Sequence, residues 1–103
     1  MKTKVSFSAV YAPSEDVVAR EIEGEMVIIP ITSYATPDED AIFTLNETGK
    51  VIWNNLNGKK TLEQTVEDLV KEYQASGAQI RRDVLGLTGE LLKRRMIVEV
   101  KRG

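Results

Sequence analysis

The chain has 103 residues, of which 42% are hydrophobic, and it contains neither cysteine nor histidine. That length supports one domain with one modest core, and the two missing residue types exclude disulfides, thiolate nucleophiles, Cys/His zinc sites and imidazole acid–base chemistry. No apolar run approaches the roughly 20 residues that cross a bilayer, and Met1 to Lys4 leads into alternating residues and not into a signal-peptide core. The sequence therefore predicts a soluble, cytoplasmic protein in a reducing compartment.

The net charge is −2, but it is distributed unevenly along the chain. From residue 79 to the end there are seven basic and three acidic side chains, which leaves +4 in this segment and −6 in the remainder. Such asymmetry occurs on surfaces that bind polyanions, and it also occurs on solvated helix flanks and tails. Charge alone leaves both interpretations open.

The first half of the chain predicts β-structure. Apolar residues alternate with polar ones from Val5 to Tyr11, as in a half-exposed strand that pairs with the protein's own sheet, with a second copy in a homodimer, or with nothing. Two β-rich runs, 17–22 and 26–31, are joined by a short connection that contains Gly24, which predicts a hairpin.

A third strand is predicted from Ala41 to Leu45, after the loop 32–40. Strand alternation puts Phe43 and Leu45 on one face, and Ile42 and Thr44 on the other.

Three helices follow. Asn46 is a good N-cap for a helix that ends at Asn57-Gly58, and residues 61–64 (Thr-Leu-Glu-Gln) fit a capping box that opens a second helix ending at Ser76-Gly77. The third helix, from about 79 to 95, has a core-facing stripe, and residues 96–100 form a closing strand. That stripe consists of Ile80, Val84, Leu87 and Leu91.

A second apolar stripe on the third helix, Leu85, Thr88 and Leu92, lies beside the core stripe. Either the sheet covers it or a partner does. Gly86 and Gly89 fall on the opposite side, where glycine weakens a helix by roughly 1 kcal/mol relative to alanine, so either something packs closely there or the turn is loose.

Candidate catalytic groups are sparse. Residues 58–61 (Gly-Lys-Lys-Thr) resemble the end of a phosphate-binding loop, but Trp53 stands where that motif needs its first glycine. The acidic run 38–40 lacks the ligand spacing and turn glycine of a calcium loop, and Glu47 is explained by its helix dipole. We therefore predict a binding protein, not an enzyme, with no metal and no cofactor.

The predicted fold class is α+β and winged helix-turn-helix-like, with an N-terminal three-stranded antiparallel sheet followed by a three-helix bundle. One reading of this pattern is a DNA-binding transcriptional regulator, with Arg81 and Arg82 near the start of a helix in the major groove. The acidic pI of about 5.2 argues against nucleic acid.

The other reading is that an extended peptide adds to an exposed sheet edge as one more strand. Its alternate side chains would enter an apolar groove between the third strand and the third helix. That groove would be floored by Ile42 or Phe43 and walled by Val84, Leu85, Thr88 and Leu92.

The order and spacing of several short segments resembles the PqqD family over roughly residues 17–98. These are peptide chaperones of pyrroloquinoline quinone (PQQ) biosynthesis and related pathways, also described as RiPP recognition elements, where RiPP denotes a ribosomally made, later modified peptide. The matching segments are Val18-Ala19-Arg20-Glu21, Gly24-Glu25, Phe43-Thr44-Leu45-Asn46-Glu47-Thr48-Gly49, Ile52-Trp53, Asn57-Gly58, Thr61-Leu62, Glu72-Tyr73 and Asp83-Val84.

The resemblance implies a non-catalytic adaptor that captures the leader segment of a precursor peptide and presents it to a modifying enzyme, often a radical-SAM enzyme. The leader would pair with Ala41 to Leu45 and pack on the third helix, with Arg81 at the rim of the groove. The loop 32–40 is longer than in the quinone-pathway member and residues 1–14 have no counterpart, which favours another pathway. We accordingly divide the chain into an N-terminal segment, 1–16, and a peptide-binding domain, 17–100.

Overall fold

The computed structural model describes residues 5–31, 42–74 and 76–100. Within them the fold is α+β, with helices and two separate antiparallel sheets. The elements, in chain order, are β1 (Val10–Pro13), β2 (Val17–Ile22), β3 (Glu25–Pro30), β4 (Phe43–Leu45), α1 (Glu47–Asn55), α2 (Leu62–Tyr73), α3 (Gly77–Lys93) and β5 (Ile97–Val100). The predicted three-stranded sheet is present, but a second sheet of two strands accompanies it, and a winged-helix arrangement is not established.

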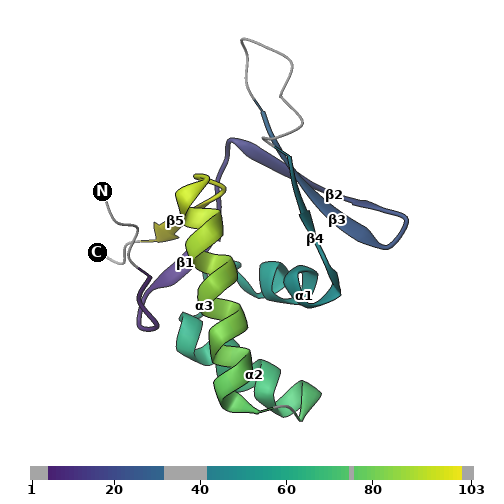
Figure 1. The fold of residues 1–103 in the computed structure, drawn as a ribbon. Coiled ribbons are helices and arrows are strands. Elements are labelled where there is room, and N and C mark those ends of the chain that lie inside the picture. The colour runs from purple at the N-terminus through teal and green to yellow at the C-terminus, as the bar shows by residue number, and fades with distance from the viewer. Residues whose placement is uncertain (1–4, 32–41, 75, 101–103) are drawn as a thin grey trace.

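Strands β2 and β3 form the predicted hairpin, which extends away from the helices in Figure 1. Ile22 pairs with Glu25, so the turn consists of Glu23 and Gly24, with φ values of 51° and 86°. A two-residue turn with positive φ at both positions matches the right-handed twist of the flanking strands. Glycine at the second position makes that turn accessible to this sequence.

Strand β4 pairs antiparallel with β3, with Met26 opposite Leu45 and Ile28 opposite Phe43. It is shorter than the predicted strand 41–45: Ile42 precedes it, and Ala41 lies outside the described residues. The sheet order is β2-β3-β4, so β4 is an edge strand among the described residues.

The N-terminal strand pairs within the chain and begins later than predicted. β1 pairs antiparallel with β5, from Val10 opposite Val100 to Pro13 opposite Ile97. Residues 5–9 contribute in another way, because the carbonyl oxygens of Phe7 and Ala9 accept hydrogen bonds from the first amides of α2. The N-terminal segment therefore satisfies donors that the start of a helix leaves unpaired.

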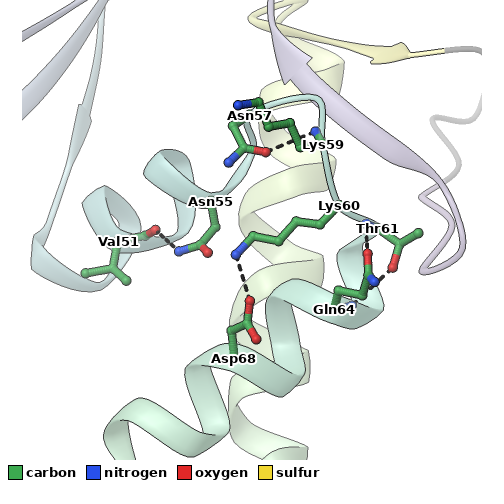
Figure 2. Close-up of polar contacts among 8 residues, drawn as sticks. All are labelled: Val51, Asn55, Asn57, Lys59, Lys60, Thr61, Gln64 and Asp68. Carbon is green, nitrogen blue, oxygen red and sulfur yellow. Dashed lines mark hydrogen bonds and ion pairs between the residues drawn. The ribbon is translucent and has the colours of Figure 1, made fainter.

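The helix caps explain where α1 and α2 begin. Asn46 Oδ1 accepts from Gly49 N at 2.7 Å, and Thr61 and Gln64 form a reciprocal capping box. Figure 2 shows that box and the connection between the two helices, in which Lys60 Nζ contacts Asp68 Oδ2 at 2.7 Å. Helix α1 ends two residues earlier than predicted, at Asn55.

One hydrophobic core joins the helices to both sheets. In Figure 1, α3 stands with β1 and β5 on one side and β4 on the other. The buried residues come from every layer, and they include Tyr11 of β1, Ile28 of β3, Leu45 of β4 and Ile97 of β5. The helices contribute Ile52, Trp53, Leu62, Val66, Leu69, Ile80, Val84 and Leu91.

Candidate functional site

A hollow of about 390 Å³ lies between β4 and α3. Phe43, Thr44 and Leu45 line it from the strand, and the start of α1 closes one end. Helix α3 contributes Asp83, Gly86, Leu87 and Glu90. A groove between a strand and a helix thus exists, as the sequence predicts, although its helical wall differs from the predicted one.

The strand side of the groove is the outer edge of the three-stranded sheet. Within the described residues, β4 pairs with β3 on one edge and with no strand on the other. The hollow is lined by β4 and not by β3, so it opens on the unpaired edge. An edge strand presents backbone amides and carbonyls that an extended chain can satisfy.

The helical wall of the groove is one flank of α3. Asp83, Gly86, Leu87 and Glu90 are three, one and three residues apart, which puts them along one side of a helix. The neighbouring face, with Ile80, Val84, Thr88 and Leu91, is buried in the core. The groove therefore runs beside the core stripe.

Val84 and Thr88, predicted as groove walls, are fully buried in the core, with no exposed surface. This corrects the predicted groove wall, because neither residue lines the hollow between β4 and α3. The Thr88 hydroxyl oxygen is buried, and it has no hydrogen-bond partner among the described residues.

Arg81, Leu85 and Leu92 lie on the flank of α3 that faces away from the groove. Leu85 is 42% exposed there, and Leu92 packs against the core. Arg81 makes a bidentate ion pair with Glu63 and lies 4.7 Å from the ring centroid of Phe7. Arg81 thus stands against the N-terminal segment and not at the rim of the groove.

The N-terminal segment lies against the flank of α3 that carries Arg81, Leu85 and Leu92, which is why these predicted groove residues do not line the groove. A Cβ built on Gly89 would meet Val5 Cγ2 at 3.6 Å, and Phe7 lies under Arg81, so residues 5–7 approach this flank of α3. The sequence shows that α3 has two flanks beside the core stripe, one with Leu85 and one with Gly86. It does not show which of the two lines the groove beside β4.

The groove is acidic on its helical side. Asp83 and Glu90 carry carboxylates, and Glu90 Oε2 accepts from Arg94 Nε at 2.7 Å. The Arg94 guanidinium carbon is 4.9 Å from the ring centroid of Phe43, which joins the end of α3 to the start of β4. The groove is thereby bounded at the Phe43 end and continues toward Asp83.

Sequence reasoning missed Asp83, Gly86, Leu87 and Glu90 as groove residues. Gly86 was the one sequence feature that could have indicated the groove, because glycine inside a helix lowers its stability and is therefore expected to have a structural or functional role. Apart from its chain neighbours and the nearby backbone of α3, no described heavy atom lies within 4 Å of the position that a Cβ would take at Gly86. The glycine widens the groove, and it does not serve close packing within the chain.

Among the described residues, no group of three or more Asp, Glu, His or Cys side chains could hold a metal ion. The pKa of Asp68 is lowered by the hydrogen bond and the charge of Lys60, but Asp68 is exposed on α2 and does not line the groove. What the groove offers is a strand edge, an apolar floor and two carboxylates.

None of the helices in the described part of the chain is long and apolar enough to span a membrane. This observation concerns those residues alone.

Comparison with known proteins points to one family. The family model described as "Coenzyme PQQ synthesis protein D (PqqD)" matches residues 25–97. The search of curated proteins found no match. Two solved structures, each 22% identical to this chain, share the fold.

The first, TbiB1 in complex with the TbiA(beta) leader peptide, has a TM-score of 0.69, with 88% of this chain and 99% of that chain covered. The second is the solution NMR structure of the PqqD truncation of Methylobacterium extorquens PqqCD, described as a functional, stand-alone RiPP recognition element. Its TM-score is 0.70, with 93% of this chain and 96% of that chain covered.

Proposed function

Because this chain belongs to the PqqD family, we propose that it is a non-catalytic adaptor that captures the leader segment of a precursor peptide. The leader adds to β4 as a further strand and lays its side chains in the groove against α3. The observation that carries the proposal is the edge of β4 that pairs with no other described strand and borders an open hollow. The two similar structures, TbiB1 in complex with a leader peptide and a stand-alone RiPP recognition element, support the same function.

The contribution of such an adaptor is binding and orientation. A disordered leader that folds onto the sheet edge loses conformational freedom once, and the attached core peptide then stays at high effective concentration near a partner enzyme. We propose a radical-SAM enzyme or another peptide-modifying enzyme as that partner. The chemistry resides in the partner, because this chain has no cysteine to hold an iron–sulfur cluster.

Within the site, we propose backbone contact with Ile42, Phe43, Thr44 and Leu45, and side-chain contact with Asp83, Gly86, Leu87 and Glu90. Backbone pairing supplies affinity that tolerates many sequences, whereas pockets for alternate side chains select among them. Ala41 was predicted to share the backbone contact and lies outside the described residues.

The test is calorimetric titration of the full chain with synthetic leaders encoded by short reading frames beside its gene. A leader that binds is then N-methylated at one backbone nitrogen at a time. Strand pairing alternates amides toward and away from the partner strand, so we expect affinity to fall at every second position of the paired segment. A uniform effect, or none, would contradict strand addition.

Variants of α3 locate the groove. Gly86→Leu should fill it and weaken leader binding at least tenfold, whereas Gly86→Ala should change affinity little. Leu85→Asp and Arg81→Ala lie on the opposite flank and serve as controls that retain affinity. Thr88→Arg is unsuitable, since it would place a charge in the core.

A measurement of binding to duplex DNA distinguishes the proposed adaptor from the alternative, a DNA-binding transcriptional regulator. If no leader binds, and DNA binds with an affinity that falls steeply with salt, the proposal is wrong and α3 is a recognition helix.

A further inference from the structure

A second hollow, of about 290 Å³, lies among α1, α2 and α3. Its floor is apolar and includes Ile52, Leu69, Ile80 and Val84, all of which belong to the core cluster. Tyr73 lines it from the end of α2, yet 52% of Tyr73 is exposed. A half-exposed aromatic side chain beside an apolar hollow is typical of a surface that receives an apolar partner group.

The second hollow continues from the groove beside β4. Thr48, Ile52 and Asp83 line both. These three side chains lie between the two hollows, so a chain that leaves the groove past Asp83 reaches the second hollow next. This adjacency makes the same peptide the occupant that we consider.

The direction of that peptide follows from the arrangement of β4 and α3. Arg94, after the end of α3, lies over Phe43 at the start of β4, and Asp83 lines the groove together with Asn46, just after β4. Helix α3 and strand β4 thus run in opposite directions, as Figure 1 shows. β4 already pairs antiparallel with β3, and antiparallel addition is the more stable ladder. A peptide antiparallel to β4 has its N-terminal end toward the start of α3, where the second hollow lies.

The carboxylates that line the second hollow indicate the charge of the peptide residue that binds beside it. Glu47 and Asp83 line the second hollow, and within the described residues neither forms an ion pair. Two carboxylates beside an apolar hollow favour a basic group next to the apolar side chain that enters it.

We infer that the second hollow is an anchor subsite for the captured peptide, an inference that rests on the proposed function. It takes a large apolar side chain, such as Leu, Phe or Tyr, with a Lys or Arg beside it. The six steps along the helix from Ile80 to Gly86 span about 9 Å, which equals about three residues of extended chain. The anchor accordingly lies about three residues N-terminal to the peptide residue opposite Gly86.

The test uses a random 16-residue peptide library displayed on its own mRNA and selected on the immobilised full chain. Enriched peptides are synthesised, and the paired segment is located by N-methylation. We expect a large apolar residue about three positions N-terminal to the segment's centre, with a basic neighbour. Its replacement by alanine should weaken binding roughly ten- to hundredfold, as expected for loss of a buried Leu or Phe.

Protein variants then show where the anchor binds. Tyr73→Ala should weaken binding of the selected peptide that retains its apolar anchor. It should change the affinity for the alanine-substituted peptide less than twofold, because the substitution in the protein and the substitution in the peptide remove the same contact. Glu47→Gln should reduce the preference for the basic neighbour. Leu85→Ala, a matched loss of an exposed apolar side chain on the other flank, should leave both peptides unaffected.

The outcomes are distinguishable. Peptides that pair with β4 but show no N-terminal anchor, or an anchor whose contribution Tyr73→Ala leaves unchanged, would overturn the subsite and spare the proposed function. A selection that enriches no peptide would overturn the proposed function and the subsite with it.

Discussion

At the scale of single residues, the buried hydroxyl of Thr88 lowers the stability of the core. Thr88 is completely buried in α3, and its Oγ1 has no hydrogen-bond partner in the part of the chain that the structure describes. A buried polar group that lacks a partner costs about 1–3 kcal/mol of desolvation. Thr88→Val keeps the β-branched shape and removes the hydroxyl, so we expect the free energy of unfolding to rise by about 1 kcal/mol.

Thr61→Val is the matched substitution with the opposite sign. The Thr61 hydroxyl accepts from Gln64 N at 3.1 Å and caps α2, so its loss should lower the free energy of unfolding by about 1 kcal/mol. Urea unfolding followed by the fluorescence of Trp53, the single tryptophan, measures both. A destabilising Thr88→Val would show that its hydroxyl has a partner in solution.

At the scale of helices, two glycines have opposite roles. At Gly49 in α1, a Cβ would meet Asn46 Oδ1, Leu45 Cβ and Leu45 Cδ2, each at 3.3 Å. At Gly86 in α3, a Cβ would enter open space. We therefore expect Gly86→Ala to stabilise the protein by about 1 kcal/mol through helix propensity, and Gly49→Ala to destabilise it by about 1–3 kcal/mol through overpacking.

The same unfolding assay compares the two alanine variants. If Gly86→Ala destabilised the protein, α3 would have to pack against something on its groove flank in the free protein. An unchanged stability in Gly49→Ala would mean that the junction of β4 and α1 yields without strain.

The helices and the hairpin could be predicted from the sequence because their signals are local. Cap residues such as Asn46 and Thr61, the turn at Gly24 and the periodicity of α3 each act over a few neighbouring positions. The groove wall depends on which flank of α3 lies beside β4 and which lies beside residues 5–7. That choice is made by tertiary packing, and the more apolar flank, with Leu85 and Leu92, is the one that faces away from the groove.

An ion pair between Lys60, which precedes α2, and Asp68, in the middle of α2, depends on pH. The hydrogen bond and charge of Lys60 lower the pKa of Asp68 from its ordinary value of 3.8 (Figure 2). A carboxyl group with a lowered pKa in the folded state contributes stability above its unfolded pKa, and this contribution is lost as pH falls through the folded pKa.

We expect Asp68→Asn to be less stable than the wild-type protein at pH 7, by a small amount that salt reduces, because the pair is exposed. The difference should shrink as the pH falls through the lowered pKa of Asp68, because the wild-type carboxyl group then becomes protonated too. Lys60→Met should reduce the same pH dependence. Thermal unfolding of the three proteins between pH 2.5 and 7 measures the effect, and a difference that did not shrink toward the lowest pH would contradict it.

At the scale of the whole molecule, the N-terminal segment completes the fold. Tyr11 is 1% exposed and belongs to the main core cluster, and its hydroxyl accepts from Ser6 N at 3.1 Å. β1 also pairs with β5, so the two ends of the described chain meet in one sheet. The predicted boundary between residues 16 and 17 thus passes between β1 and β2, and the core lies on both sides of it.

Tyr11→Ala should therefore destabilise the protein by about 3–5 kcal/mol, the usual range for loss of a buried aromatic side chain. Tyr11→Phe removes only the hydroxyl and should lower stability by about 1 kcal/mol. A domain of this size is stable by about 5–15 kcal/mol, so a chain that begins at residue 17 should lose its cooperative urea transition in circular dichroism. A truncated chain that unfolded at the same urea concentration as the full chain would show that β1 is dispensable and that 17–100 is a domain in its own right.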